Sequence, residues 1–121
     1  MMAADDRRRR DALVDLVDLR VSLSAAIAAT KQLPWDSDVE QVLLSRANVV
    51  GLLARYLRRE LSSDDLEAWA NAVEGREDIG VEPHDAEMLR KFIFEFANPE
   101  LAHPISDSSV HRWLNRLSDK D

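Results

Sequence analysis

The chain has 121 residues, 45% of them hydrophobic and 32% charged, and its formal net charge is −7. This length and composition predict one soluble globular domain, residues 1–121, with a hydrophobic core. The sequence contains no cysteine, which excludes disulfide frameworks, thiol catalysis and cysteine-ligated zinc, and its three glycines cannot form a phosphate-binding loop.

No targeting or membrane segment is expected. The longest stretch of low charge, residues 21–30, is about half the length that a membrane span needs. Aspartates at 11, 15 and 18 interrupt the place where a secretory signal would need an apolar region. We therefore expect a cytoplasmic protein without a membrane partner. Its acidic charge disfavours binding to nucleic acid, because phosphates would repel it.

The first helix is expected to follow a short frayed N-terminal end, residues 1–4. Residues 119–121 are expected to fray at the C-terminal end. Three of the arginines 7–10 lie four residues from an aspartate, in the pairs Asp5/Arg9, Asp6/Arg10 and Arg7/Asp11. Such i, i+4 pairs are typical of a solvated helix face. Leu13, Leu16 and Val17 form its apolar stripe. The segment 19–24 is compatible with a break, a short strand or continuous helix.

A long central helix is predicted over about residues 37–60. Pro34 ends the preceding element, Trp35 either covers the core or is an exposed recognition aromatic, and residues 36–38 offer three successive caps. The spacing of apolar residues then defines one buried face, made by Val39, Leu43, Val50, Leu53 and Leu57.

Arg46 interrupts this apolar face, and a lone guanidinium is costly to bury. Three interpretations remain open. In the first, Arg46 forms a structural ion pair with Glu74 or Asp78. In the second, the apolar stem of its side chain is buried while the guanidinium reaches solvent. In the third, it lines a pocket for an anionic ligand.

The segment 61–79 predicts a helix that starts at Ser62 or Ser63 and stops at Gly75. Acids dominate residues 60–87, which hold ten of them against one base, Arg76, a local charge of −9. Either Arg76 pairs with one acid on a solvated surface, or the carboxylates face a basic partner. The candidate partner-binding residues share one flank of the helix or follow its end: Glu67, Asn71, Glu74, Glu77 and Asp78.

Two further helices are expected, joined to this segment by an extended link at residues 79–81. One has a buried face at Ala86, Leu89, Phe92, Ile93 and Phe96, with Met88 and Phe94 off that face. The other is capped at residue 106 or 107, with an apolar face at Val110, Trp113, Leu114 and Leu117. The fold class predicted is all-α, a single compact bundle of about five helices around residues 37–60.

Signals for catalysis are missing from the sequence. His84, His103 and His111 show no i, i+4 pair for a metal, and the serines lie at caps rather than in a nucleophile elbow. We expect no enzyme, and we assign no catalytic residue, metal ligand or cofactor.

The run Tyr56-Leu57-Arg58-Arg59-Glu60-Leu61-Ser62-Ser63-Asp64-Asp65-Leu66-Glu67-Ala68-Trp69 resembles a hinge in small helical immunity proteins of the colicin D-like class, over about 20 of the 121 residues. That resemblance implies a bacterial helical bundle that neutralises a secreted nuclease by laying acidic side chains into the cleft where the toxin holds RNA. It implies that the partner is met by Glu67, Glu74, Glu77 and Asp78.

The function expected is a non-enzymatic protein-binding module, immunity-like or inhibitor-like, whose acidic surface at 60–87 meets a basic protein such as a nuclease toxin. One alternative is a helix-turn-helix-like regulator in which arginines 7–10 or 55–59 touch DNA. The other is a small-molecule-binding protein with Arg46 in a pocket. The sequence pattern indicates no particular oligomeric state.

Overall fold

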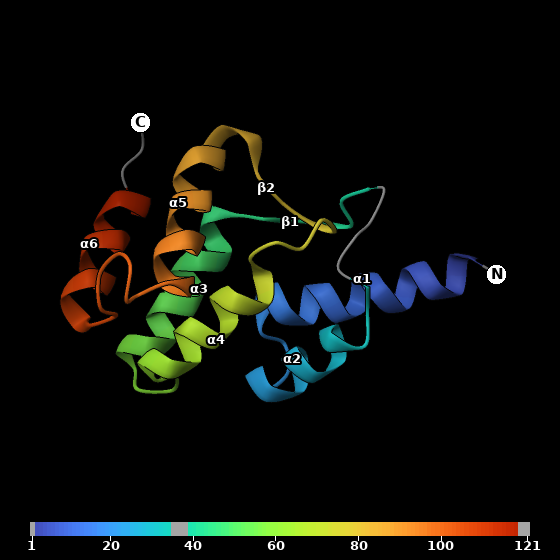
Figure 1. Ribbon diagram of the computed structural model, residues 1–121, viewed down its shortest axis with the longest axis horizontal. Helices are drawn as coiled ribbons and strands as arrows, with labels where there is room; N and C mark the ends of the chain where they lie inside the picture. Colours follow the sequence, from blue (N-terminus) through green and yellow to red (C-terminus); the bar gives the residue numbers. More distant parts are fainter. Residues whose placement is uncertain (1, 35–38, 119–121) are drawn as a thin grey trace.

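The computed structural model describes residues 2–34 and 39–118 and shows a predominantly helical chain (Figure 1). A helical fold is thus confirmed, but the all-α bundle of five helices is wrong, because the described residues also form a small sheet and a sixth helix. The elements are α1 Met2–Asp18, α2 Leu23–Lys31, β1 Val42–Leu44, α3 Arg46–Leu57, α4 Ser63–Val73, β2 Ile79–Val81, the 3₁₀ turn η1 Pro83–Asp85, α5 Ala86–Ala97 and α6 Asp107–Ser118.

The helices are spread along the long axis of the molecule. Figure 1 shows α1 and α2 together at one end and α6 at the other, with α3, α4 and α5 between them. Strands β1 and β2 pair in parallel, with Val42 opposite Ile79 and Leu44 opposite Val81. Parallel strands need a long crossover, and α3 and α4 supply it.

The long central helix expected over residues 37–60 does not form. Residues 42–44 are a strand, and α3 starts only after Ser45, whose side chain and that of Asn48 form a reciprocal capping box. The strand partner lies more than thirty residues downstream, at Ile79–Val81, so no local pattern could reveal it. The caps proposed at residues 36–38, and Trp35, lie outside the described residues.

Several side chains assigned to the buried face of that helix are therefore on the surface. Val39 and Leu43 are 59% and 45% exposed, and Val50 is exposed on α3. Leu53 is buried on α3, as expected, together with Val49, Leu52 and Tyr56.

The first two helices are separated by a break at residues 19–24, the segment for which the sequence left three possibilities. Leu19 adopts a left-handed conformation, with φ of 52°, and is buried. The Ser22 hydroxyl then accepts a hydrogen bond from the Ala25 amide at 3.3 Å and starts α2. Residues 2–4, expected to fray, belong to α1.

Two tryptophans hold the helices around one core. The Trp69 indole of α4 is fully buried and donates a hydrogen bond to the Leu16 carbonyl of α1 at 3.0 Å. Its ring lies 6.4 Å from that of Phe92 on α5, and the Phe92 ring in turn meets Trp113 of α6 edge-on at 5.4 Å. These aromatic contacts connect α1, α4, α5 and α6 and keep α4 in a fixed position.

A buried ion pair fastens α1, α2 and the sheet to one another. Arg76 and Asp78 are 6% and 0% exposed, and the guanidinium donates two hydrogen bonds of 2.9 Å to the two carboxylate oxygens. Arg76 also donates to the Thr30 carbonyl at the end of α2, at 3.3 Å, and to the Pro34 carbonyl, at 2.8 Å. Arg9 of α1 lies 3.4 Å from Asp78. We call Arg9, Arg76 and Asp78 the buried charge network.

We expect Asp78→Asn to lower the free energy of unfolding by about 3–5 kcal/mol, because it leaves buried guanidinium charge uncompensated. The double variant Arg76→Met/Asp78→Leu should recover part of that loss, since it removes both charges together. Urea unfolding followed by circular dichroism measures the three proteins.

The matched control is Glu60→Gln, which removes one partner of the exposed Arg58–Glu60 pair. It should leave the urea midpoint nearly unchanged. An Asp78→Asn midpoint as close to wild type as that of Glu60→Gln would show that the network contributes nothing to stability.

Candidate functional site

The solvent side of α4 carries an aligned set of polar side chains. The helix buries Leu66, Trp69, Ala70 and Val73. Four polar side chains lie outside this buried arc, and at 100° per residue they fall within roughly 80° of one another. We call this set the α4 acidic face: Asp64, Glu67, Asn71 and Glu74.

The described residues offer no ion pair to the carboxylates of the α4 acidic face. Asp64 and Glu67 form no ion pair among residues 2–34 and 39–118. Glu74 accepts one long hydrogen bond, 3.4 Å, from the neutral amide of Asn98. Asp65, by contrast, serves the helix start, because its side chain accepts from the Ser62 amide at 2.9 Å. The structure thus leaves three negative charges together on one rigid helix.

Asp78 does not belong to this surface, and its assignment as a partner-facing residue is wrong. Its carboxylate is fully buried against Arg76 and Arg9. Arg76 is likewise inside the protein as one half of an ion pair, rather than at its surface. Glu77, between them, is exposed but lies in the turn beyond α4. Sequence reasoning missed Arg9 and the carbonyls of Thr30 and Pro34 as partners in this network.

The acidic surface is smaller than residues 60–87. Three of the ten acids in that window are held by this chain's own arginines, namely Glu60 by Arg58, Asp78 by Arg76, and Asp85 by Arg46. Glu82 and Glu87 are exposed but stand outside α4. The α4 acidic face therefore remains as the continuous part.

Arg46 lies at the start of α3 rather than within an apolar helix face. Its Nη2 is 2.7 Å from an Asp85 oxygen, and its Nη1 donates to the Leu117 carbonyl at 2.6 Å. Arg46 thus forms a structural ion pair, as one of the three interpretations held, but its partner is Asp85. The expected partners Glu74 and Asp78 were wrong, because the 37–60 helix on which that geometry rested does not form. Arg46 joins α3 to η1 and to the end of α6.

Phe94 is an aromatic side chain on the surface of α5. It is half exposed, as its position off the buried face of α5 suggested. The Asn98 amide donates both to the Phe94 carbonyl, at 2.9 Å, and to the Glu74 carboxylate. This bridge brings the last turn of α5 next to the end of α4, and Phe94 lies one helical turn before Asn98.

The arginines in the last turn of α3 and directly after it are engaged within the chain. Arg55 donates to the Leu19 carbonyl at 3.2 Å, and Arg58 pairs with Glu60. Arg59 forms two hydrogen bonds, of 3.1 and 3.0 Å, with Asp107, and these hold the pKa of the Asp107 carboxyl below its usual value. These contacts compete with any phosphate contact by residues 55–59.

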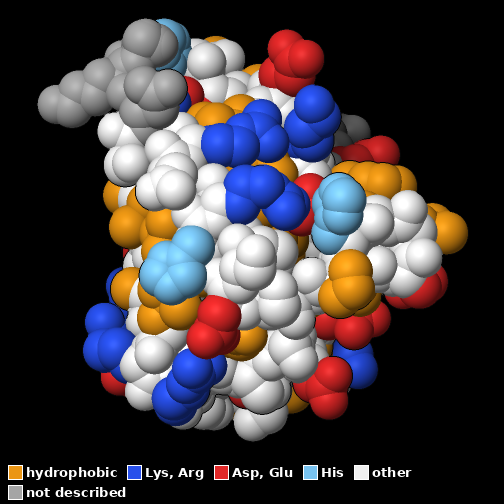
Figure 2. All heavy atoms as spheres, turned by 90° about the vertical axis from the view of Figure 1, so that its left-hand side faces the viewer, with side chains coloured by type: hydrophobic (Ala, Val, Ile, Leu, Met, Phe, Trp, Pro, Cys, Tyr) orange, Lys and Arg blue, Asp and Glu red, His pale blue; other side chains and the backbone are white. Residues whose placement is uncertain are grey.

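Positive charge gathers on a different face. Figure 2 shows the α6 side of the molecule, where Lys and Arg side chains cluster in the upper middle. Arg112 and Arg116 are exposed on α6, and the Arg116 guanidinium lies 4.2 Å from the centre of the Trp113 ring. The charge of the folded protein is therefore unevenly distributed between its faces.

Within the described part of the chain, no group of three or more His, Asp or Glu side chains is placed to hold a metal ion. No helix of that part is both long enough and apolar enough to cross a membrane. No family model, no curated protein and no solved structure matches the chain.

The Arg46–Asp85 pair should contribute to stability in a pH-dependent way. The hydrogen bond from Arg46 lowers the pKa of Asp85 below its ordinary value of 3.8. A lowered folded-state pKa adds stability above the unfolded pKa, and that stability is lost as the pH falls through the folded pKa. We expect Asp85→Asn to unfold at lower urea concentration than wild type at pH 6, and this gap to shrink below pH 3.8.

The control is Glu82→Gln, an exposed carboxylate with no ion pair in the described residues. Its difference from wild type should be small at both pH values. A gap for Asp85→Asn that stays constant down to pH 2.5 or so would exclude the ion pair as its source.

Proposed function

We propose that this protein is a non-enzymatic protein-binding module and that the α4 acidic face docks a basic protein partner. The observation that supports this proposal most directly is the alignment of Asp64, Glu67 and Glu74 on one face, where none of them forms an ion pair with a described residue. A carboxylate held in an ion pair must break that pair before it can bind a partner. These three have no such pair to break.

The packing of α4 supports the same proposal. Trp69 and Leu66 are fully buried, and the Ser62–Asp65 capping box fixes the first turn. Charges presented by such a rigid element lose little conformational entropy when they meet a partner. Phe94 adds an exposed aromatic group of the kind that is enriched at interfaces.

The mechanism would have two stages. Negative charge on α4 attracts the basic surface of the partner and accelerates association, an effect that salt weakens. Contact then covers the partner's anion-binding surface. For a nuclease, the partner class that the likeness of residues 56–69 suggests, this surface is the cleft that holds RNA phosphates, so binding would inhibit the enzyme in an immunity-like manner.

The test compares two variants of equal net charge. Glu67→Gln/Glu74→Gln neutralises the α4 acidic face, while Asp11→Asn/Glu82→Gln neutralises two exposed acids elsewhere. Each immobilised protein is exposed to a bacterial lysate, and the retained basic proteins are identified and then titrated singly. We expect wild type and the control to bind one basic protein with similar affinity, and the α4 variant to bind it about tenfold more weakly or worse.

Salt provides a second reading of the same experiment. The wild-type association rate should fall steeply as sodium chloride rises to about 0.3 M, where the Debye length is roughly 6 Å, and the α4 variant should show a flatter dependence. Equal weakening by both variants would mean that only overall charge matters, and the proposed surface would be withdrawn.

A further inference from the structure

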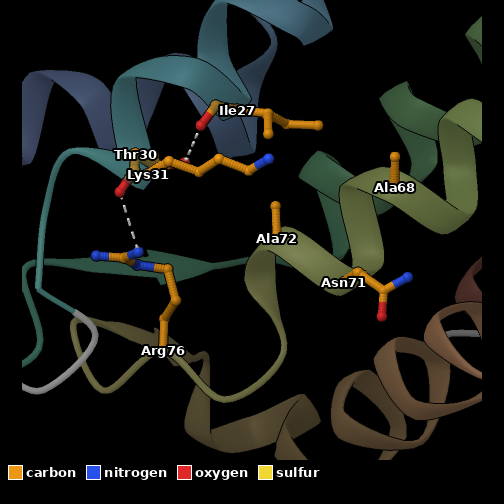
Figure 3. Close-up of a pocket in the computed structure, with 7 residues that line it drawn as sticks. All are labelled: Ile27, Thr30, Lys31, Ala68, Asn71, Ala72 and Arg76. Carbon is orange, nitrogen blue, oxygen red and sulfur yellow. Dashed lines mark hydrogen bonds between the residues drawn. The ribbon is translucent and has the colours of Figure 1, made fainter.

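A groove of about 270 Å³ lies between α2 and α4, on the flank of α4 away from α5. Its walls are small and apolar, because Ala68 and Ala72 of α4 face Ile27 of α2 (Figure 3). The Thr30 hydroxyl is turned to the Ile27 carbonyl, to which it donates a hydrogen bond of 3.0 Å. The groove therefore offers apolar contact along its length.

The polar groups around the groove are cationic or neutral. Figure 3 shows the Lys31 side chain extending from α2 along Ile27, with its ammonium end above Ala72. Lys31 is exposed and forms no ion pair within residues 2–34 and 39–118. Asn71 stands at the outer rim, and Arg76 closes one end, where it is bound to the Thr30 carbonyl. No Asp or Glu is among the residues that line the groove.

We propose that this groove binds a small apolar molecule carrying one carboxylate, with the apolar body against Ala68, Ala72 and Ile27 and the carboxylate on Lys31. The argument is one of complementarity. The walls favour hydrocarbon, and the single ammonium at the mouth favours negative charge. A cationic ligand of the same shape would meet Lys31 with like charge and find no carboxylate in the groove.

The size of the groove limits the ligand. About 270 Å³ lies just below the range for drug-sized small-molecule sites, which fits a chain or ring system of about ten non-hydrogen atoms. The groove is open on its outer side, so binding should be modest, with a dissociation constant in the millimolar range. Octanoate is a suitable probe.

The experiment follows the methyl groups of isotopically labelled full-length protein by NMR during titration with octanoate, octanol and octylammonium. We expect octanoate to shift the methyl signals of Ile27, Ala68 and Ala72, octanol to act more weakly, and octylammonium to act least. Lys31→Met should reduce the octanoate affinity by up to about fivefold, to that of octanol. Lys31→Glu should reverse the preference towards octylammonium.

Two further variants complete the design. Lys91→Met removes an exposed lysine of α5 and should leave octanoate binding unchanged. Ala72→Leu fills the groove and should reduce binding about tenfold or more, provided that circular dichroism shows a native spectrum. Because Lys31 is on the surface, its variants test the proposal even if Ala72→Leu fails to fold. Equal shifts by octanoate and octylammonium, or octanoate shifts outside the groove, would overturn it.

Discussion

The bidentate contact between Arg76 and Asp78 is the interaction on which most of this structure depends. The two residues are only two positions apart in sequence, yet they contact distant segments. Arg76 binds the Thr30 carbonyl at the end of α2 and the Pro34 carbonyl. Asp78 lies beside Arg9 of α1, and its backbone carbonyl accepts a hydrogen bond of 3.2 Å from the Val42 amide of β1. A buried charge is tolerated only where its hydrogen bonds are satisfied. Here both partners are satisfied, and the sheet is held against the helices.

That contact also determines which charges reach the surface. It takes Asp78 and Arg76 out of the acidic segment, so neither of these charges contributes to the surface of α4 or of the turn after it. It also fixes the end of α2 beside the end of α4, which sets the width of the groove between Ala72 and Ile27. The proposed protein-binding face and the proposed ligand groove are thus the two flanks of a single helix, and one ion pair positions both.

The parts of the fold that could be predicted from sequence are those with local causes. Helix α4 was predicted because Ser62, the acidic first turn and the spacing from Leu66 to Val73 all lie within one segment, and Gly75 ends it with φ of 85°. Strand β1 was missed because its stabilising partner is β2, far along the chain. The error about the partners of Arg46 followed from the missed strand, because its position was inferred from a 37–60 helix that does not form. Asp78 was misplaced because counting charges along a sequence treats every carboxylate as exposed.

The two flanks of α4 should influence one another through charge. The Lys31 ammonium lies above Ala72 (Figure 3), and Ala72 is on the same eleven-residue helix as Glu67. Such a helix is roughly 16 Å long, about two Debye lengths at physiological salt. The field of Glu67 and Glu74 opposes an anion in the groove, and a basic protein on the acidic face would cancel that field. Occupation of either proposed site would therefore favour the other, by the same factor in both directions. The coupling is electrostatic and needs no conformational change, so it should grow as ionic strength falls and vanish when Glu67 and Glu74 are neutral.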